Sequence, residues 1–244
     1  MDGAGGGLPL DGAVVAVTGA SRGIGRATAR LLAGRGAAVA LLARNAGELE
    51  AVAGEIERAG GTALPLPTDI TSERDVAVAF RAIADRFDGL NALINNAAVG
   101  LYGAVAEYPL EHWHRTLAVN LTGVFLCTRA AIPLLRRRSG GHIVAVSSGA
   151  GKRGYANLAA YSASKFGLIG FMQSIADELS PENIKACVVT PGSVLTTFAG
   201  RSVEEKRRSG GAKYLKPEDV AEVILFVLTR PQRAWPQEID LWPF

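Results

Sequence analysis

The chain has 244 residues, of which 48% are hydrophobic and 20% are charged, and 26 Lys+Arg against 23 Asp+Glu leave a net charge of +3. This composition excludes disordered and fibrous proteins, and the length suffices for one large domain with a sizeable core or for two small ones. The small net charge gives no reason to expect a nucleic-acid or membrane partner.

Cysteine content and the absence of export features indicate a cytoplasmic protein. The two cysteines, Cys127 and Cys187, cannot form a disulfide framework, so we expect a reducing compartment. Residues 1–9 are expected to form a flexible Gly-rich tail, since they have neither a basic region nor an apolar segment of an export signal. The longest charge-free run, residues 89–106, is too polar for a membrane span.

Short apolar runs alternate with amphipathic stretches along the chain. Strands of a parallel sheet that is buried on both faces read as such runs, and helices that cover the sheet read as amphipathic segments. The strands are predicted at 13–17, 39–42, 63–66, 90–94, 143–146, 184–189 and 238–241. The helices are predicted from the turn after the first strand through residue 31, and at 47–58, 75–87, 110–135, 160–179 and 217–228.

The alternation predicts the fold class. Strands that are separated by helices of ten or more residues form βαβ units, which build a doubly wound α/β fold with helices on both faces of a parallel sheet. No linker or repeat divides the chain, so residues 10–244 are predicted to form a single domain.

A glycine-rich turn joins the first strand to the first helix. Its glycines, Gly19, Gly23 and Gly25, let the backbone turn tightly, and the helix N-terminus offers free N–H groups to an anion. The turn therefore predicts a phosphate-binding site at the carboxyl ends of the strands. The alternative is a tight strand–helix connection without a ligand.

The end of the second strand bears on the choice of cofactor. A dinucleotide fold that prefers NAD places an acid here for the ribose 2′-hydroxyl, whereas this chain has Ala43 and Arg44. Arg44 and Arg22 offer planar, charged groups for a 2′-phosphate, which favours NADP(H). The alternative is that Arg44 starts a surface loop.

Three further residues suggest acid–base chemistry. Ser148 follows the strand at 143–146, and Tyr161 and Lys165 lie four positions apart on one face of a predicted helix. A nearby cation lowers the pKa of a tyrosine, so Tyr161 is a candidate proton donor or acceptor, with Ser148 on the same substrate oxygen. Taken alone, the Tyr–Lys pair also fits an ordinary helix face.

Several motifs recur in the order and spacing of one known family. Residues 18–25 read Thr-Gly-x-x-x-Gly-x-Gly, and Asn120, Ser148, Tyr161 and Lys165 follow as a tetrad. In these features, and over nearly its whole length, the chain resembles the short-chain dehydrogenase/reductase family. The other matching segments are Asp69-Ile70, Asn95-Asn96-Ala97 and Pro191-Gly192 with Thr196 beyond.

The resemblance implies a Rossmann-type oxidoreductase that transfers a hydride between NADP(H) and a carbonyl or alcohol substrate. Tyr161 would be the general acid/base, and Ser148 would orient and polarise the substrate oxygen. Lys165 would lower the Tyr161 pKa and bind the nicotinamide ribose, and Asn120 would interrupt its helix and hold a water that connects Lys165 to solvent. No metal site is expected, because the histidines and cysteines have no metal-ligand spacing. The implied cofactor-binding residues are Gly19, Ser21, Arg22, Gly23, Ile24, Gly25, Arg44, Asp69, Ile70, Asn96, Tyr161, Lys165, Pro191, Gly192, Val194 and Thr196.

The chain departs from the family pattern at two places. Ala98 stands where the Asn-Asn-Ala run has a glycine, and the last residues, 235–244, lack the ending common in the family's 3-oxoacyl-carrier-protein reductases. A 3-oxoacyl thioester (acyl-carrier-protein) reductase is therefore an alternative rather than the first expectation. An alternative of another class is a non-catalytic NADP(H)-binding sensor or scaffold.

The resemblance also implies how the rest of the chain is used. The helices at 110–135 and 160–179 would form the face of a homodimer, or of a dimer within a homotetramer, and residues 193–216 would form a substrate lid. For the basic, Gly-flanked part of that lid, residues 201–211, a disordered surface loop is an equal alternative. The apolar C-terminus, residues 241–244, is expected in an interface or beside a neighbour's pocket. The substrate pocket is expected to be apolar and aromatic, suiting a mid-sized apolar ketone, with a lining from 98–102, 149–155 and 193–201.

Overall fold

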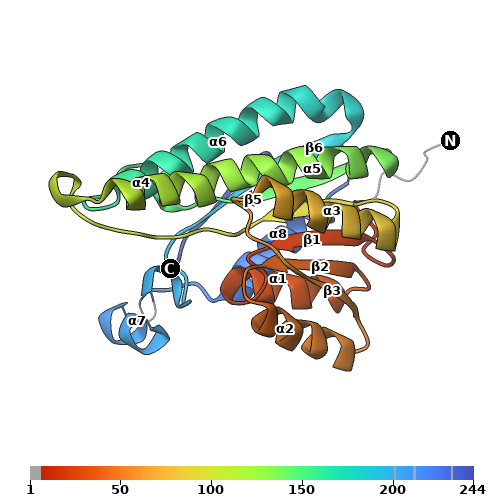
Figure 1. The fold of residues 1–244 in the computed structure, drawn as a ribbon, viewed down its shortest axis with the longest axis horizontal. Helices are drawn as coiled ribbons and strands as arrows, with labels where there is room; N and C mark the ends of the chain where they lie inside the picture. Colours follow the sequence, from red (N-terminus) through yellow and green to blue (C-terminus); the bar gives the residue numbers. More distant parts are fainter. Residues whose placement is uncertain (1–6, 201, 211–212, 232) are drawn as a thin grey trace.

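A seven-stranded parallel sheet organises the protein. The computed structural model describes residues 7–200, 202–210, 213–231 and 233–244. The strand order is β3-β2-β1-β4-β5-β6-β7, and every pairing is parallel (Figure 1). The strands are β1 (Val14–Thr18), β2 (Ala38–Ala43), β3 (Thr62–Pro67), β4 (Ala92–Asn95), β5 (Gly141–Val146), β6 (Ile184–Pro191) and β7 (Glu238–Leu241).

Helices cover both faces of the sheet, and each face has its own hydrophobic core. One core joins α3, α5 and α6 to the sheet, and the other joins α1, α2 and α8 to it (Figure 1). The predicted doubly wound α/β fold is thereby confirmed. The helices are α1 (Gly23–Ala33), α2 (Ala46–Arg58), α3 (Glu73–Phe87), α4 (Leu110–Leu117), α5 (Gly123–Arg137), α6 (Ala159–Leu179), α7 (Val203–Gly210) and α8 (Pro217–Leu228).

Local capping explains where several helices start. The Asn45 side chain accepts a hydrogen bond from the backbone of Glu48 at the start of α2, and Ser72 does the same for α3. Each bond satisfies one of the N–H groups that a helix start leaves without a partner. These signals lie in neighbouring residues, so the predicted starts at 47 and 75 fall within two residues of the observed ones.

The helix predicted at 110–135 is not one regular helix. A π-helical turn, Ala118–Thr122, separates α4 from α5 and carries the fully buried Asn120. This π turn agrees with the interruption that the resemblance implied, since π turns inside helices are frequent at functional sites. By length and composition, Leu110–Arg137 is apolar enough to cross a membrane, but here α5 packs in the core beside the sheet.

The predicted tail and lid are held to the domain where the structure describes them. Leu8 donates a backbone hydrogen bond to Leu228 at 2.9 Å and packs against the core, while residues 1–6 of the predicted tail lie outside the described residues. In the predicted lid, Val194 pairs with Leu215, which closes the base of the segment. Residues 201, 211 and 212 of that lid lie outside the described residues, and α7 lies between them.

His142 places a titratable side chain inside the sheet. It lies on β5, is 7% exposed, and its Nδ1 has no hydrogen-bond partner among the described residues. Burial, assisted by the positive charge of Lys185, lowers the pKa of His142 to about 4. The folded protein therefore holds His142 in its neutral form at physiological pH.

This burial predicts a specific loss of stability in acid. An unfolded histidine has a pKa of about 6.5, so between pH 6.5 and 4 the unfolded chain binds the proton and the folded chain does not. The free energy of unfolding should fall by about 3 kcal/mol from this group as the pH falls through that window. Urea unfolding at pH 7 and at pH 4.5 should show a smaller loss for His142→Val than for wild type. The exposed His114 provides the control, because His114→Gln should leave the loss unchanged.

Candidate active site

A cleft of about 960 Å³ opens where the carboxyl ends of the strands meet. It is lined by the segments that follow each of the seven strands and by the predicted lid. Ligands of open parallel sheets bind at this edge, because the connections from two neighbouring strands run to opposite faces of the sheet and leave a crevice between them. The cleft is therefore the candidate active site.

The glycine-rich turn forms one side of the cleft. Gly19 and Gly23 have φ angles of +65° and +55°, a conformation that side chains with a Cβ rarely adopt. Gly25 does not line the cleft; it lies behind the turn, where an added Cβ would come within 2.2 Å of the Gly19 carbonyl oxygen. Gly25 thus allows α1 to pack against the turn, which differs from the direct cofactor contact that the sequence predicted.

The N-terminus of α1 faces this turn, and no side chain of its own occupies the free N–H groups there. Its first turn has no acidic residue, and Arg22, at the N-cap position, makes no side-chain capping hydrogen bond. Its N–H groups and the positive end of the helix dipole remain available to an anion.

Asn96 holds the turn in place from the end of β4. Its Nδ2 donates to the carbonyl oxygens of Thr18 and Gly19, at 3.0 and 3.2 Å. The Thr18 hydroxyl accepts in return from the backbone N–H groups of Asn96 and Ala97, both at 3.0 Å. Asn96 also lines the cleft, so one side chain rigidifies the turn and borders the space in front of it.

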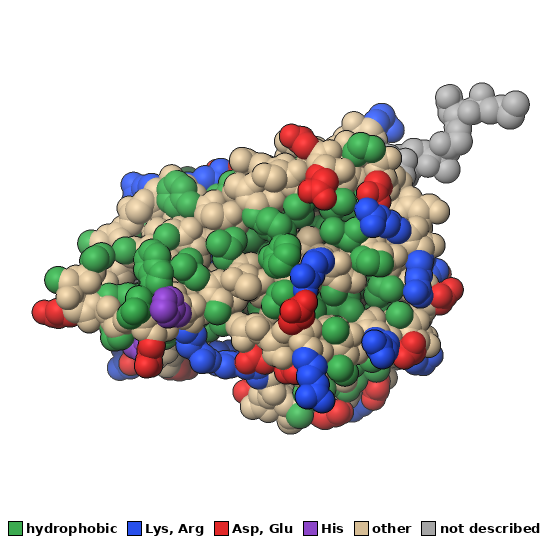
Figure 2. Space-filling model, turned by 45° about the horizontal axis from the view of Figure 1, so that its top comes forward, with side chains coloured by type: hydrophobic (Ala, Val, Ile, Leu, Met, Phe, Trp, Pro, Cys, Tyr) green, Lys and Arg blue, Asp and Glu red, His purple; other side chains and the backbone are tan. Residues whose placement is uncertain are grey.

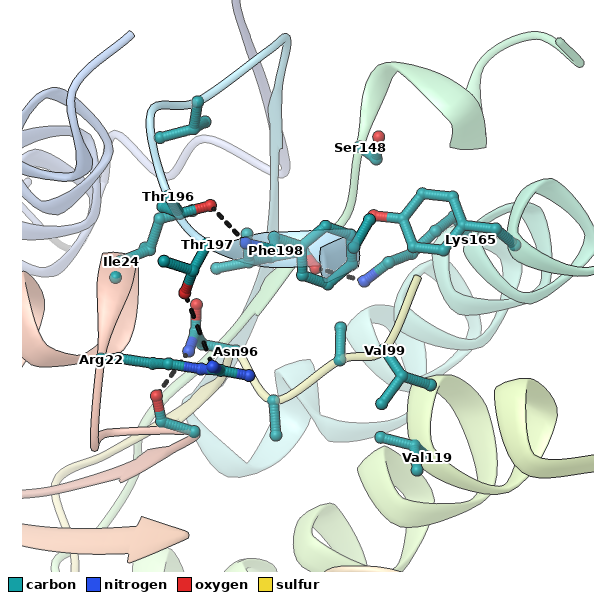
Figure 3. Close-up of a pocket in the computed structure, with 18 of the residues that line it drawn as sticks. Arg22, Ile24, Asn96, Val99, Val119, Ser148, Lys165, Thr196, Thr197 and Phe198 are labelled. Atoms are coloured by element: carbon teal, nitrogen blue, oxygen red, sulfur yellow. Dashed lines mark hydrogen bonds between the residues drawn. The ribbon is translucent and has the colours of Figure 1, made fainter. Parts of the chain in front are cut away.

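Two arginines flank the cleft on the side of β2. Arg44 and Arg22 are both exposed at its rim, and Arg22 donates to the Thr197 hydroxyl at 3.5 Å across the opening (Figure 3). Partial burial opposes ionisation of Asp69, but hydrogen bonds from Thr71 and the charges of Arg44 and Arg115 hold its pKa below the usual value. This part of the cleft is positively charged and offers planar donors to a phosphate.

Ser148 and Tyr161 meet at the base of the cleft. Ser148 follows β5, and Tyr161 lies in the first turn of α6, where it is 7% exposed and near enough to Ser148 for the serine to act on its pKa. The Ser148 hydroxyl also accepts from the backbone of Ala150 at 3.2 Å, which fixes its orientation. A substrate oxygen placed beside this pair would meet two hydroxyl groups at once.

Lys165 lies one helical turn beyond Tyr161 and is 2% exposed. Its Nζ donates to the Val146 carbonyl oxygen at 2.8 Å and lies 5.8 Å from the centre of the Tyr161 ring (Figure 3). Burial lowers the pKa of Lys165 to about 7. The Lys165 side chain is therefore partly deprotonated near neutral pH.

The expected lowering of the Tyr161 pKa is wrong for this structure. Burial and the neighbouring Tyr102 raise the pKa of Tyr161, and the hydrogen bond with Ser148 opposes them only in part. The physical reason is that loss of water disfavours phenolate more than the available partners stabilise it. Tyr161 is consequently protonated throughout the neutral range.

Asn120 supports the site from behind and does not line the cleft. Its Oδ1 accepts from the Val99 backbone at 2.8 Å, and its Nδ2 donates to the Val99 carbonyl at 3.0 Å and to Ser164 at 3.1 Å. These bonds connect the π turn to the segment after β4 and to α6. The predicted water between Asn120 and Lys165 stays a prediction.

The structure brings most of the predicted residues to one cleft, and the lining segments expected near 98–102, 149–155 and 193–201 all contribute. Among the predicted residues, only Gly25 and Asn120 are absent from the lining that the structure describes. Those that line the cleft are Gly19, Ser21, Arg22, Gly23, Ile24, Arg44, Asp69, Ile70, Asn96, Ser148, Tyr161, Lys165, Pro191, Gly192, Val194 and Thr196.

Aromatic side chains that the sequence did not assign individually complete the wall. The Tyr161 ring lies 5.7 Å from that of Tyr102 and 5.8 Å from that of Phe198, measured between centroids. Trp242, expected at an interface or a neighbour's pocket, instead lines the cleft of its own chain. The sequence showed only that aromatic residues lie in or near the predicted pocket segments. It did not show which way their side chains point.

The arrangement fits a dinucleotide. One part of the cleft has the glycine-rich turn, the uncapped N-terminus of α1 and the two arginines at the rim. Another part has the hydroxyl groups of Ser148 and Tyr161 beside the buried Lys165. The first part suits phosphates, and the second suits proton transfer to an oxygen.

Comparison with known proteins gives the same picture. The family model of the short chain dehydrogenases matches residues 13–207. A 3-oxoacyl-[acyl-carrier-protein] reductase of Synechocystis sp. is 35% identical over 93% of this chain and 93% of its own length. A glycine betaine reductase of Emericella nidulans is 33% identical to this chain. The match covers 96% of this chain but only 19% of that longer protein.

A solved structure agrees in fold. The metagenomic short-chain oxidoreductase in complex with NADP has a TM-score of 0.84 and 34% identity, covering 97% of this chain and 99% of the other. The family match, the parallel sheet and the cleft residues all lead to one assignment: the chain belongs to the short-chain dehydrogenase/reductase family.

Proposed function

We propose that this oxidoreductase interconverts a carbonyl compound and an alcohol with NADP(H). The observation that carries the proposal is the grouping of Ser148, Tyr161 and the buried Lys165 in the cleft that the glycine-rich turn borders. A protein that only bound a nucleotide, such as a sensor, would have no use for this grouping.

The residues have distinct tasks in the reducing direction. Bound NADPH supplies the hydride that reduces the carbonyl carbon. Tyr161 donates its phenolic proton to the carbonyl oxygen, and Ser148 orients that oxygen by a hydrogen bond. Lys165 places a positive charge near the phenolate that Tyr161 becomes, and Asn120 fixes α6 and the Val99 segment around them.

The site also supports a proton acceptor role in the opposite direction. Because Tyr161 is protonated at neutral pH, oxidation of an alcohol needs its phenolate and should accelerate as the pH rises. Reduction needs the phenol, which persists far into the alkaline range, so a loss of reduction above neutral pH would come from the Lys165 charge and not from Tyr161.

The arginines at the rim are proposed to select NADP(H) over NAD(H). Arg44→Asp should lower the ratio of kcat/KM for NADPH to that for NADH by about 10- to 100-fold, because a charge-assisted contact of about 1.5–3 kcal/mol becomes a repulsion. Steady-state kinetics with both coenzymes measures the ratio. Arg35→Asp makes the same charge change at an exposed site away from the cleft and should leave the ratio unaltered. An unchanged ratio in Arg44→Asp would refute the role of Arg44 in binding a 2′-phosphate.

A 3-oxoacyl thioester reductase is the second candidate. The 35% identity with the Synechocystis enzyme over nearly the whole chain favours it. The aromatic C-terminal segment beside the pocket favours a compact ketone instead, since Trp242 narrows the side next to Ser148.

A substrate panel separates the candidates. NADPH oxidation should be followed with simple ketones, β-keto esters, α-diketones and acetoacetyl-CoA, while NADPH binding is measured separately by its fluorescence. Turnover of ketones without acetoacetyl-CoA supports the first proposal, and dominant turnover of acetoacetyl-CoA supports the second. NADPH binding with no turnover on the whole panel would contradict both.

We also propose that the protein is cytoplasmic and forms an oligomer. Figure 2 shows hydrophobic side chains gathered on the face where α4, α5 and α6 lie, and Leu110, Phe125 and Phe166 are 68%, 42% and 47% exposed. Large exposed apolar groups on neighbouring helices suit a second copy of the chain. We therefore propose a homodimer or homotetramer through α5 and α6.

A further inference from the structure

Trp242 reaches the cleft because β7 ends at the same edge as the other strands. β7 runs parallel to β6, with Leu241 beside Pro191, and the Gly192 N–H donates to the Leu241 carbonyl at 2.8 Å. The next residue, Trp242, therefore lies directly after the sheet, and its indole lines the cleft.

Two glycines accommodate the indole. A Cβ at Gly149 would lie 2.6 Å from the Trp242 Cη2, and a Cβ at Gly192 would lie 3.0 Å from its Cε3. Neither glycine has a positive φ, so the backbone conformation does not require glycine at these positions. The indole in its observed position leaves no room for a Cβ at Gly149, and Gly149 is the neighbour of Ser148.

An ion-pair network holds the strand that carries Trp242. The Lys152 Nζ pairs with the carboxylates of Glu238 and, at 3.5 Å, Asp240, which joins β7 to the segment after Ser148. The hydrogen bond with Glu238 raises the pKa of Lys152, so this lysine is charged over the whole neutral range. Trp242 is thus positioned from both the sheet and the Ser148 segment.

Other aromatic rings border the Tyr161 side of the same space. Phe198 and Tyr102 contact Tyr161, and a Cβ at Gly100 would come within 2.6 Å of Phe198 and 2.9 Å of the Tyr102 hydroxyl. Figure 3 shows Phe198 in the lid segment, reaching toward Ser148 and Lys165. Aromatic surface therefore lies beside the Tyr161 ring and beside Gly149, the neighbour of Ser148.

Trp242 keeps 53% of its surface exposed although it is packed against two glycines. A large ring that stays half-exposed in a cleft offers a flat face to a ligand, and aromatic rings stack favourably on such faces. Aliphatic chains of the same size gain only from area burial there.

We propose that Trp242 is a specificity-determining residue, which selects ketones with a planar aromatic group attached to the carbonyl. The proposal rests on the carbonyl–alcohol function above and names its substrate class. The aryl group would lie on the indole, while Ser148 and Tyr161 hold the carbonyl oxygen.

A matched pair of ketones tests the selectivity. Acetophenone and cyclohexyl methyl ketone have the same number of carbon atoms, but only acetophenone has a planar ring. The two ketones differ in intrinsic reactivity, so the ratio of their kcat/KM values is compared between variant and wild type, where that difference cancels. In Trp242→Ala, the ratio of kcat/KM for acetophenone to that for cyclohexyl methyl ketone should fall about tenfold from its wild-type value. Trp242→Phe keeps a flat ring and should retain most of the ratio. Phe244→Ala, in the same segment but fully exposed and outside the described lining, should leave it unchanged.

A double-mutant cycle separates recognition from support of the fold. Gly149→Ala would push the indole away and should lower the ratio in the same direction. In the background of Trp242→Ala, where the indole is gone, the same substitution should have no further effect on the ratio.

The outcomes distinguish this inference from the function on which it rests. Equal losses for both ketones in Trp242→Ala would overturn the aromatic selectivity and leave the carbonyl–alcohol function intact. If wild type binds NADPH but reduces neither these ketones nor any other member of the panel, the function fails and the inference fails with it.

Discussion

Replacing Tyr161 by Phe is expected to lower kcat/KM for carbonyl reduction by about 10²- to 10⁴-fold, the usual contribution of a general acid. Tyr161 is 7% exposed and its ring packs against Tyr102 and Phe198, so the substitution removes the proton donor and keeps the packed ring. The variant should fold, because Phe keeps the ring contacts with Tyr102 and Phe198. NADPH oxidation measures the loss, and NADPH fluorescence should show binding close to that of wild type.

Tyr155 provides the matched control for this prediction. It lines the same cleft, but its ring stacks on the Arg153 guanidinium at 4.6 Å and it makes no contact with the Ser148–Tyr161 pair that the structure records. Tyr155→Phe should change kcat/KM by less than about threefold, because it removes one hydroxyl of the cleft wall that has no recorded contact with Ser148 or Tyr161. Activity retained in Tyr161→Phe, or a comparable loss in Tyr155→Phe, would refute the assignment of Tyr161 as the acid.

Replacing Lys165 by Met is expected to cost about 10²-fold or more in kcat/KM and to change the pH dependence of reduction. Met is similar in length and apolar, so it suits a position that is 2% exposed. The substitution removes the charge that lies 5.8 Å from the Tyr161 ring and stabilises the phenolate formed during reduction.

The pH profile distinguishes this electrostatic role from simple support. The pKa of Lys165 is lowered to about 7, so its ammonium form dominates below pH 7 and is lost as the pH rises through that value. Wild-type kcat/KM for reduction should therefore fall on the alkaline side with an apparent pKa near 7, and Lys165→Met should lack this limb. A variant that is less active but has the wild-type profile would show that Lys165 acts only by packing.

Much of the fold was predictable because buried parallel strands have a local signature. The apolar run at 184–189 lies inside β6 (Ile184–Pro191), and the run at 39–42 lies inside β2 (Ala38–Ala43). The prediction for β5 began at 143, but the strand begins at Gly141 and includes the buried His142. A glycine and a histidine do not read as a buried strand, and only pairing with β4 and β6 holds them there.

The site was predictable in its residues more than in their properties. The spacing of Tyr161 and Lys165 placed both on one helix face, where the structure has them. The direction of the Tyr161 pKa shift was wrong, because a pKa depends on how completely packing removes water from the group. Spacing along a helix carries no information about that burial.

By itself, the sequence determined the order of strands and helices, the glycine-rich turn and the resemblance to the family, because periodicity and motif spacing are local properties of the chain. Only the tertiary structure decided that Gly25 packs behind the turn, that Asn120 braces Val99, and that Trp242 enters its own chain's cleft. These contacts join segments 6 to more than 90 residues apart, such as Gly149 and Trp242. Which side chains meet there depends on how seven strands and their helices pack together, and no local pattern encodes that geometry.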